Sequence, residues 1–272
     1  MTQNILPVSL LALGSAMAPA AVLFQDNFNA PDTGNLDLSD QSGRRSGLEP
    51  NIQVRSSRVQ HGIAGTQLNF LSARTGRIRF HEDTDNDTST GEIWNDWASG
   101  TTGANIIGST GLRVELDWIA GNDTSTNWIS VNLGINSEGA GEPGFRVNDA
   151  GTDIGMLLRF NGDSELFDNG VNLGAQGSFT PTIGLRHVTL DYTFDSFADG
   201  TNVNLVANVD GTEIYNDNPF TWSGNNGELY LELGTLENTL IDNVTISNIP
   251  VPEPSSSILA LVGALGLIRR RR

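Results

Sequence analysis

The sequence predicts an all-β fold, an antiparallel β-sandwich built from short strands. Apolar and polar residues alternate over many segments of the chain, and turn-forming residues separate these segments. The 272 residues include 31 glycines and only 17% charged residues, a composition typical of strands joined by many turns. Only the C-terminal end has a run suited to a helix, so we expect one short hydrophobic helix there.

Three segments show the alternation most clearly. The first places its apolar residues at every second position: Leu112, Val114, Leu116 and Trp118. Because successive side chains of a strand point to opposite faces, such a strand buries one face and exposes the other. The same pattern recurs over 188–194 and 228–233, and further strands are expected near 52–56, 67–72, 76–81, 127–135, 153–160, 203–209 and 239–247. Two dipeptides between strands, Asp199-Gly200 and Asp210-Gly211, are typical of two-residue hairpins.

The first 21 residues have the pattern of a secretory signal peptide. An apolar run from Ile5 to Leu13 precedes small residues that fit the A-x-A cleavage pattern, and we expect cleavage between Ala18 and Ala21. No lysine or arginine precedes the apolar run, and the alternative is a buried strand over 5–13. The expected body of the protein is therefore 22–249.

The last residues, 250–272, predict a weak membrane anchor. Pro252 and Pro254 cannot continue a strand ladder, so the sandwich ends before them. No charged side chain occurs from Ile258 to Ile268, and a helix over 251–268 reaches about 27 Å, marginal against a hydrocarbon core of about 30 Å. By the positive-inside rule, four arginines keep the tail cytoplasmic and the body outside: Arg269, Arg270, Arg271 and Arg272.

This tail resembles the PEP-CTERM sorting signal. The resemblance rests on the order of Val251, Pro252, Glu253 and Pro254, an apolar helix with Gly263 and Gly266, and a terminal arginine cluster. It implies that an exosortase in the inner membrane recognises the Pro-Glu-Pro segment and processes the chain there. The protein would then reach the cell envelope or an extracellular polysaccharide matrix. The alternative is an ordinary tail-anchored protein.

The body resembles the laminin-G and concanavalin A-like jelly-roll domains. The resemblance rests on three segments. The first is an opening strand at 23–28, and the last is a closing I-D-N-V-T-I strand at 241–246. Between them, a strand and hairpin over 186–215 contain the V-x-V-x-V-D-G-like run ending at Gly211. Together they cover most of 22–248. The resemblance implies that 22–249 form a single jelly-roll β-sandwich.

Composition excludes several functions. The formal net charge is −17, and all fifteen basic residues are arginine. Such a surface repels nucleic acid and attracts divalent cations, so we expect no nucleic-acid partner. The absence of cysteine excludes thiol catalysis and zinc–thiolate sites.

The sequence predicts a non-catalytic protein. Laminarinase-like glycoside hydrolases share the jelly-roll fold and carry E-x-D-x-x-E on one strand, and here Glu115 and Asp117 are followed by Ala120. Without the last carboxylate, no group protonates the leaving group, so we interpret the two acids as the solvated face of a strand. The three histidines, His61, His81 and His187, form no recognisable triad. A glycoside hydrolase or lyase on the same fold remains the alternative.

Two groups of residues are candidate ligands. Asp83, Asp85 and Asp87 have the alternate spacing with which a loop surrounds Ca²⁺, although a solvated acidic loop is the simpler alternative. Trp94 and Trp97 lie in a polar, glycine-rich stretch where exposed rings would stack on sugars. Trp118 and Trp128 fit the core-facing alternation. The predicted function is an exosortase-sorted envelope or matrix protein that engages polysaccharide, with a purely structural or adhesive surface protein as a further alternative.

Overall fold

A computed structural model describes the backbone of residues 20–28, 45–46, 53–56, 61–64, 67–70, 75–83, 94–95, 111–120, 127–135, 147–148, 152–223, 229–236 and 239–249. Side chains are described for 20–28, 111–119, 127–134, 147–148, 152–223, 231–235 and 239–249. These residues contain strands and turns but no helix, which confirms the all-β prediction. Ala21–Ile249 form one compact unit, and the end segments 1–20 and 250–272 form another. The signal peptide and the C-terminal helix lie outside the described residues and stay predictions.

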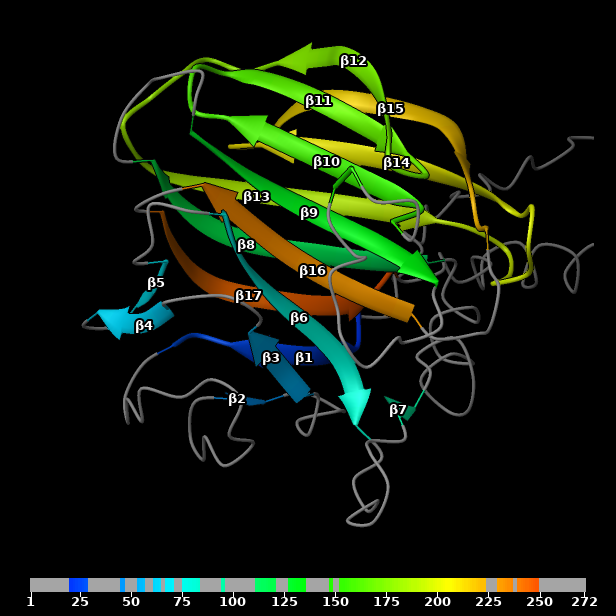
Figure 1. The fold of residues 1–272 in the computed structure, drawn as a ribbon, viewed down its shortest axis with the longest axis horizontal. Helices are drawn as coiled ribbons and strands as arrows, with labels where there is room; N and C mark the ends of the chain where they lie inside the picture. The colour runs from blue at the N-terminus through cyan, green and yellow to red at the C-terminus, as the bar shows by residue number, and fades with distance from the viewer. Residues whose placement is uncertain are drawn as a thin grey trace, which may run out of the picture. The chain divides into compact units, whose positions relative to one another are not determined.

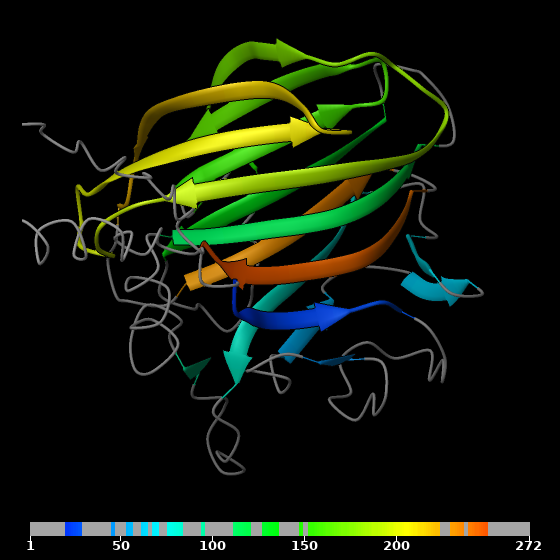
Figure 2. The same ribbon diagram turned by 180° about the vertical axis from the view of Figure 1, so that it is seen from behind.

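The body is a sandwich of two sheets in which every strand pair is antiparallel. In the described part of the chain, sheet A has the order β15-β14-β13-β8-β17-β1-β2, with β4 and β5 attached beside β17. Figure 2 views this sheet from outside. Its strands are β1 (Val22–Asp26), β2 (Arg45–Ser46), β4 (His61–Ala64), β5 (Gln67–Phe70), β8 (Gly111–Ala120), β13 (Gly184–Thr193), β14 (Asn202–Val209), β15 (Thr212–Thr221) and β17 (Leu240–Asn248).

Sheet B lies in front of sheet A in Figure 1. Its order, again among the described residues, is β12-β11-β10-β9-β16-β6-β3, with β7 paired to β6. Its strands are β3 (Gln53–Ser56), β6 (Thr75–Asp83), β7 (Trp94–Asn95), β9 (Trp128–Ile135), β10 (Ile154–Arg159), β11 (Asp163–Asp168), β12 (Val171–Ser178) and β16 (Leu229–Leu236). Both sheets combine consecutive neighbours with non-consecutive ones, such as β8 beside β17 and β9 beside β16, because the chain crosses repeatedly between the layers, as in a jelly roll.

The hydrophobic core fills the space between the sheets, as the alternation predicts. Leu112, Val114, Leu116 and Trp118 of β8 are at most 1% exposed, and Val188, Leu190 and Tyr192 of β13 and Leu231 and Leu233 of β16 are buried to the same degree. Trp118 packs against Phe160 and Phe179, with ring centroids 5.1 and 6.1 Å apart. The inward faces of β8, β13 and β16 are therefore the buried ones where their side chains are described.

One predicted hairpin is confirmed and the other is wrong. Asp210 and Gly211 have φ values of +52° and +75° and join β14 to β15 directly, as expected for Asp-Gly. Asp199-Gly200 instead lies within the longer connection between β13 and β14. That connection closes over the core, because Phe197 packs on Trp222 with ring centroids 5.8 Å apart.

Candidate functional site

Strand β9 presents one aromatic side chain on the outer face of sheet B. Ile129, Val131 and Leu133 are in the core and at most 1% exposed. Because side chains alternate along a strand, Trp128 faces away from the core, and its ring is only partly buried. The expectation that both tryptophans serve packing is confirmed, but Trp118 packs in the main core and Trp128 against a small cluster on the outer face. This strand begins with two adjacent apolar residues, Trp128 and Ile129, and the side chain of Ile129 is the one buried in the core.

A small apolar cluster supports the Trp128 ring from below. The ring packs against Val147, Leu157 and Phe167, which are 4–9% exposed. Gly155 allows this close packing, since a Cβ atom at that position would lie 2.8 Å from Val147 Cγ2 and 3.2 Å from Phe167 Cβ. The ring is thus held on a fixed base rather than free to rotate into solvent.

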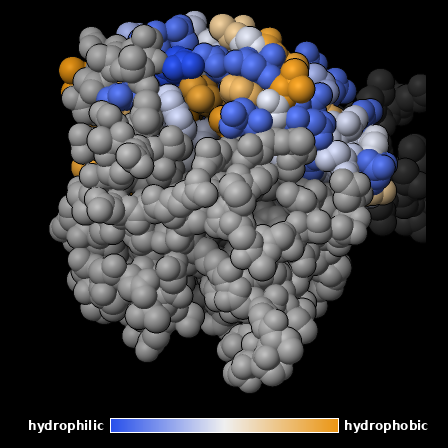
Figure 3. Space-filling view, viewed as in Figure 1, coloured by the Kyte–Doolittle hydropathy of each residue, from blue (hydrophilic) through white to orange (hydrophobic). Residues whose placement is uncertain are grey.

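Polar side chains continue from the ring across the neighbouring strands. Arg159 of β10 is the register partner of Trp128. Its Nε donates to Glu165 Oε1 of β11 at 2.6 Å, and Asn172 Nδ2 of β12 donates to Glu165 Oε2 at 3.1 Å. We call the four residues Trp128, Arg159, Glu165 and Asn172 the Trp128 surface. Figure 3 shows hydrophilic and hydrophobic residues intermixed over the described strands on this side of the molecule.

The charge state of this surface is fixed by its own contacts. The hydrogen bond from Arg159 lowers the pKa of the Glu165 carboxyl, against the opposing effect of partial burial, and the bond from Asn172 lowers it further. Glu165 is therefore a carboxylate at neutral pH with both oxygens engaged. A carboxylate held by a guanidinium accepts hydrogen bonds and has no proton to donate at neutral pH.

A different cluster forms on the outer face of sheet A. His187 Nδ1 lies 2.8 Å from Asp117 Oδ1, and Asn243 Nδ2 donates to Asp117 Oδ2 at 2.7 Å. Glu115 Oε1 is 4.0 Å from His187 Nε2. The structure thus places His187 beside the two acids of the E-x-D motif, because β8 and β13 pair with Asp117 opposite His187. Both acids are on the outer face, as interpreted from the alternation.

The residues predicted to bind calcium or sugar lie mostly outside the described part of the chain. This holds for Asp85, Asp87 and Trp97, and for the side chains of Asp83 and Trp94. The backbone nevertheless adds one fact, because β6 and β7 pair with Asp83 opposite Trp94. The predicted acidic loop and the predicted aromatic stretch therefore meet at one strand pair, and both ligand assignments stay predictions.

The described residues contain neither a metal-binding cluster nor a membrane-spanning helix. No three histidine or acidic side chains among them are arranged to hold a metal ion. None of the described segments forms a helix with the length and hydropathy needed to cross a bilayer.

Comparison with known proteins decides the nature of the tail. A family model described as the PEP-CTERM protein-sorting motif matches residues 250–272. The chain carries this sorting motif at its C-terminus. The match contains the expected signal residues from Val251 to Pro254 and from Arg269 to Arg272. A comparison with curated proteins found no match.

Solved structures that resemble the body share its fold at very low sequence identity. A sialidase of Trypanosoma rangeli, in complex with 2,3-difluorosialic acid, has a TM-score of 0.50 and 12% identity over 88% of this chain. The match covers 32% of the sialidase, so the chain spans about a third of that enzyme. The potassium-bound carbohydrate recognition domain of Emp46p has a TM-score of 0.45 and 9% identity, over 73% of this chain and 88% of that domain. The exoplasmic domain of VIP36, bound to Ca²⁺ and Man3GlcNAc, has a TM-score of 0.44 and 8% identity, over 76% and 86%.

Proposed function

We propose that this chain is an exported, exosortase-sorted protein of the cell envelope or extracellular matrix whose β-sandwich binds polysaccharide without cleaving it. In this proposal residues 1–21 are a removable signal peptide, 22–249 are the binding body, and 250–272 hold the chain in the inner membrane with the arginines in the cytoplasm until processing. The sorting motif at 250–272 supports the route. The Trp128 surface supports the binding activity.

The observation that carries the binding proposal is the pairing of an aromatic ring with oriented polar groups. Sugars bind by placing their C–H faces on an aromatic ring while side chains at the rim bind their hydroxyls. Trp128 supplies the ring on a fixed apolar base. Arg159, Glu165 and Asn172 supply donors and acceptors already oriented by each other, so little side-chain entropy is lost on binding. Several solved structures of similar fold are carbohydrate recognition domains, which agrees with the proposal.

Substitution of the ring tests the proposal directly. Trp128→Leu keeps the apolar packing but removes the flat ring, and we expect polysaccharide binding to weaken at least tenfold. The assay is affinity electrophoresis of the purified full chain through gels that contain neutral or acidic polysaccharides, with and without calcium. Leu185→Ala is the matched control, because Leu185 is 62% exposed on sheet A, and it should bind like the wild type. Absence of wild-type binding to every polysaccharide would reject the proposal.

Catalysis is the second candidate function, and one observation favours it. Asp117, His187 and Glu115 place two carboxylates around an imidazole on sheet A, and such groups can serve general acid–base chemistry. The cluster lies on the outer face of a sheet, and both Asp117 oxygens already accept hydrogen bonds. Hydrolysis of a polysaccharide by the full chain that disappears in Glu115→Gln and in His187→Gln would establish the enzyme, and unchanged polysaccharide would reject it.

A further inference from the structure

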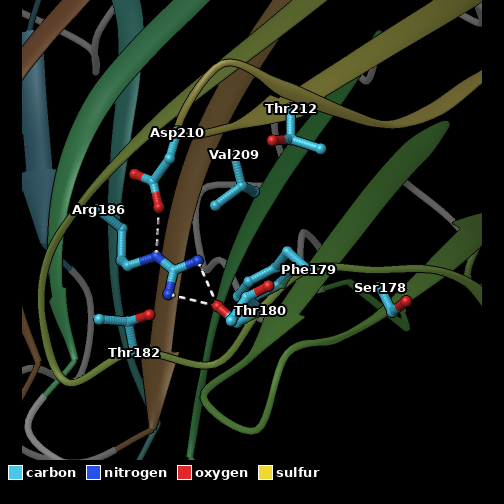
Figure 4. Close-up of a pocket in the computed structure, with 8 residues that line it drawn as sticks. All are labelled: Ser178, Phe179, Thr180, Thr182, Arg186, Val209, Asp210 and Thr212. Carbon is cyan, nitrogen blue, oxygen red and sulfur yellow. Dashed lines mark hydrogen bonds and ion pairs between the residues drawn. The ribbon is translucent and has the colours of Figure 1, made fainter.

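A pocket lies at the end of the sandwich where the β12–β13 connection faces the β14–β15 hairpin (Figure 4). Its volume is about 420 Å³, within the range of about 300 to 1,000 Å³ that is usual for small-molecule sites. Its walls include Phe179, Thr180, Thr182, Arg186, Asp210 and Thr212. We call it the end pocket.

Arg186 is the central group of the end pocket. Its side chain is 3% exposed, and its Nε lies 2.8 Å from Asp210 Oδ2. Both terminal nitrogens donate to the same oxygen, the backbone carbonyl of Thr180, at 2.7 Å (Figure 4). A guanidinium has five N–H donors, and two of them bond to the Thr180 carbonyl. The buried Nε makes no hydrogen bond to another described residue although it lies close to Asp210, and a buried unpaired donor is costly unless a ligand or water completes it.

The surroundings hold this guanidinium in place. Its carbon lies 5.0 Å from the centre of the Phe179 ring, a cation–π distance. Asp210 is held as well, since its Oδ1 accepts from the backbone nitrogen of His187 at 2.9 Å. Its position at the turn, with φ of +52°, aims the carboxylate at Arg186. Neither partner of the ion pair needs to move for a ligand to enter.

The chemistry of the walls selects an uncharged, hydroxyl-rich ligand. Arg186 and Asp210 cancel each other's charge, and the threonine hydroxyls of the rim both donate and accept hydrogen bonds. The chain carries a net charge of −17, which disfavours an anionic ligand. Hydroxyls of a sugar satisfy both the spare guanidinium donors and the rim. We propose that the end pocket is a binding site for one neutral sugar residue, separate from the Trp128 surface.

This inference deepens the proposed function and rests on it, since a second sugar site would let one body engage polysaccharide at two places. Two sites on one molecule raise the overall affinity by making the second contact intramolecular. The Trp128 surface spans β9 to β12, and the end pocket follows where β12 leaves sheet B. A neutral polysaccharide would then be cross-linked or wrapped rather than held at a single point.

The test uses monosaccharides, because each is small enough for the end pocket alone. Saturation-transfer NMR on the full chain would measure glucose, mannose, galactose and galacturonate. At least one neutral sugar should bind, and the double variant Thr182→Val, Thr212→Val should weaken it at least tenfold. These changes keep the shape of exposed side chains and remove only hydroxyls, so folding is preserved. Thr189→Val on the outer face of sheet A is the control and should leave binding unchanged.

The outcomes separate the two proposals. Three results would overturn the proposal for the end pocket. The first is unchanged monosaccharide binding in the double threonine variant, and the second is binding of galacturonate in preference to every neutral sugar. The third is no monosaccharide binding at all. If polysaccharide binding is then still lost in Trp128→Leu, the proposed function stands alone. If monosaccharides bind through the threonines while no polysaccharide is retained by the wild type, the end pocket stands and the proposed function fails.

Discussion

The ion pair between Arg159 and Glu165 gives a test of the Trp128 surface that combines stability with binding. Glu165→Gln removes the carboxylate that accepts from Arg159 at 2.6 Å and from Asn172 at 3.1 Å. The two charged side chains are 26% and 19% exposed, so solvent screens the pair in part. Loss of one charge-assisted hydrogen bond at such a site should lower the free energy of unfolding by about 1 kcal/mol at pH 7.

The pH dependence of this stability difference shows whether the charge of Glu165 is its cause. The pKa of Glu165 is lowered in the folded protein from its ordinary value of 4.5, mainly by Arg159. The carboxylate therefore contributes stability above the unfolded value, and that contribution is lost as the pH falls through the lower folded value. Urea unfolding of wild type and variant should differ at pH 7 and converge at the acid end of the range in which the protein stays folded. An equal difference at both pH values would refute the role of the charge.

A second ion pair provides the matched control. Arg113 on sheet A donates to both carboxylate oxygens of Asp191, at 2.6 and 2.7 Å. Asp191→Asn should lower the free energy of unfolding at least as much, because two hydrogen bonds from Arg113 lose their charged acceptor. Only Glu165→Gln should also weaken polysaccharide binding. If both variants weaken binding equally, the effect is one of folding or overall charge and not of the Trp128 surface.

Two further predictions concern carboxylates elsewhere in the chain. Burial raises the pKa of Asp242, and the charges of Asp117 and Asp26 raise it further. Asp242→Asn should therefore increase the free energy of unfolding by about 0.5 kcal/mol at pH 7. This gain, measured by urea unfolding, should vanish as the pH falls through the raised pKa toward 3.8. The acidic loop predicts that millimolar Ca²⁺ raises the melting temperature by several degrees in calorimetry and that EDTA reverses this rise. The rise should be absent when the aspartates at 83, 85 and 87 are replaced by asparagine. An equal rise in that variant would place the ion elsewhere.

The sequence predicted β8, β13 and β14, which alternate cleanly, and missed β11 and β12, which do not. β8, β13 and β14 each bury every second residue, and the predicted ranges agree with the observed strands within a few residues. β11 contains adjacent buried residues, Leu166 and Phe167, which pack on opposite faces of sheet B. β12 is exposed along most of its length and rich in small residues, so it has no periodic signal. Both were therefore absent from the prediction.

The candidate site was harder to predict than the fold for the same reason. Arg159 and Glu165 are on β10 and β11, and their contact depends on the hairpin between these two strands. Trp128 was expected to pack in the core, and with Trp128 and Ile129 adjacent the sequence alone does not show which of them faces the core. The signal that would have found the site is an arginine and a glutamate on either side of Asn161-Gly162, a turn that brings β10 and β11 together. The sorting motif needed no structure, since its residues are contiguous.

Charge alone does not make a binding site on this protein, and the two outer faces show why. Arg113–Asp191 and Arg159–Glu165 are both partly exposed ion pairs, and they lie on opposite sheets. The register partners beside the first pair are Ser247 and Val206, which offer no flat apolar surface. Beside the second pair lies Trp128, packed on its own apolar cluster. Because an acidic body gains little from attracting a neutral polymer through charge, the proposed function requires the ring to supply most of the affinity, with the ion pair orienting hydroxyls next to it.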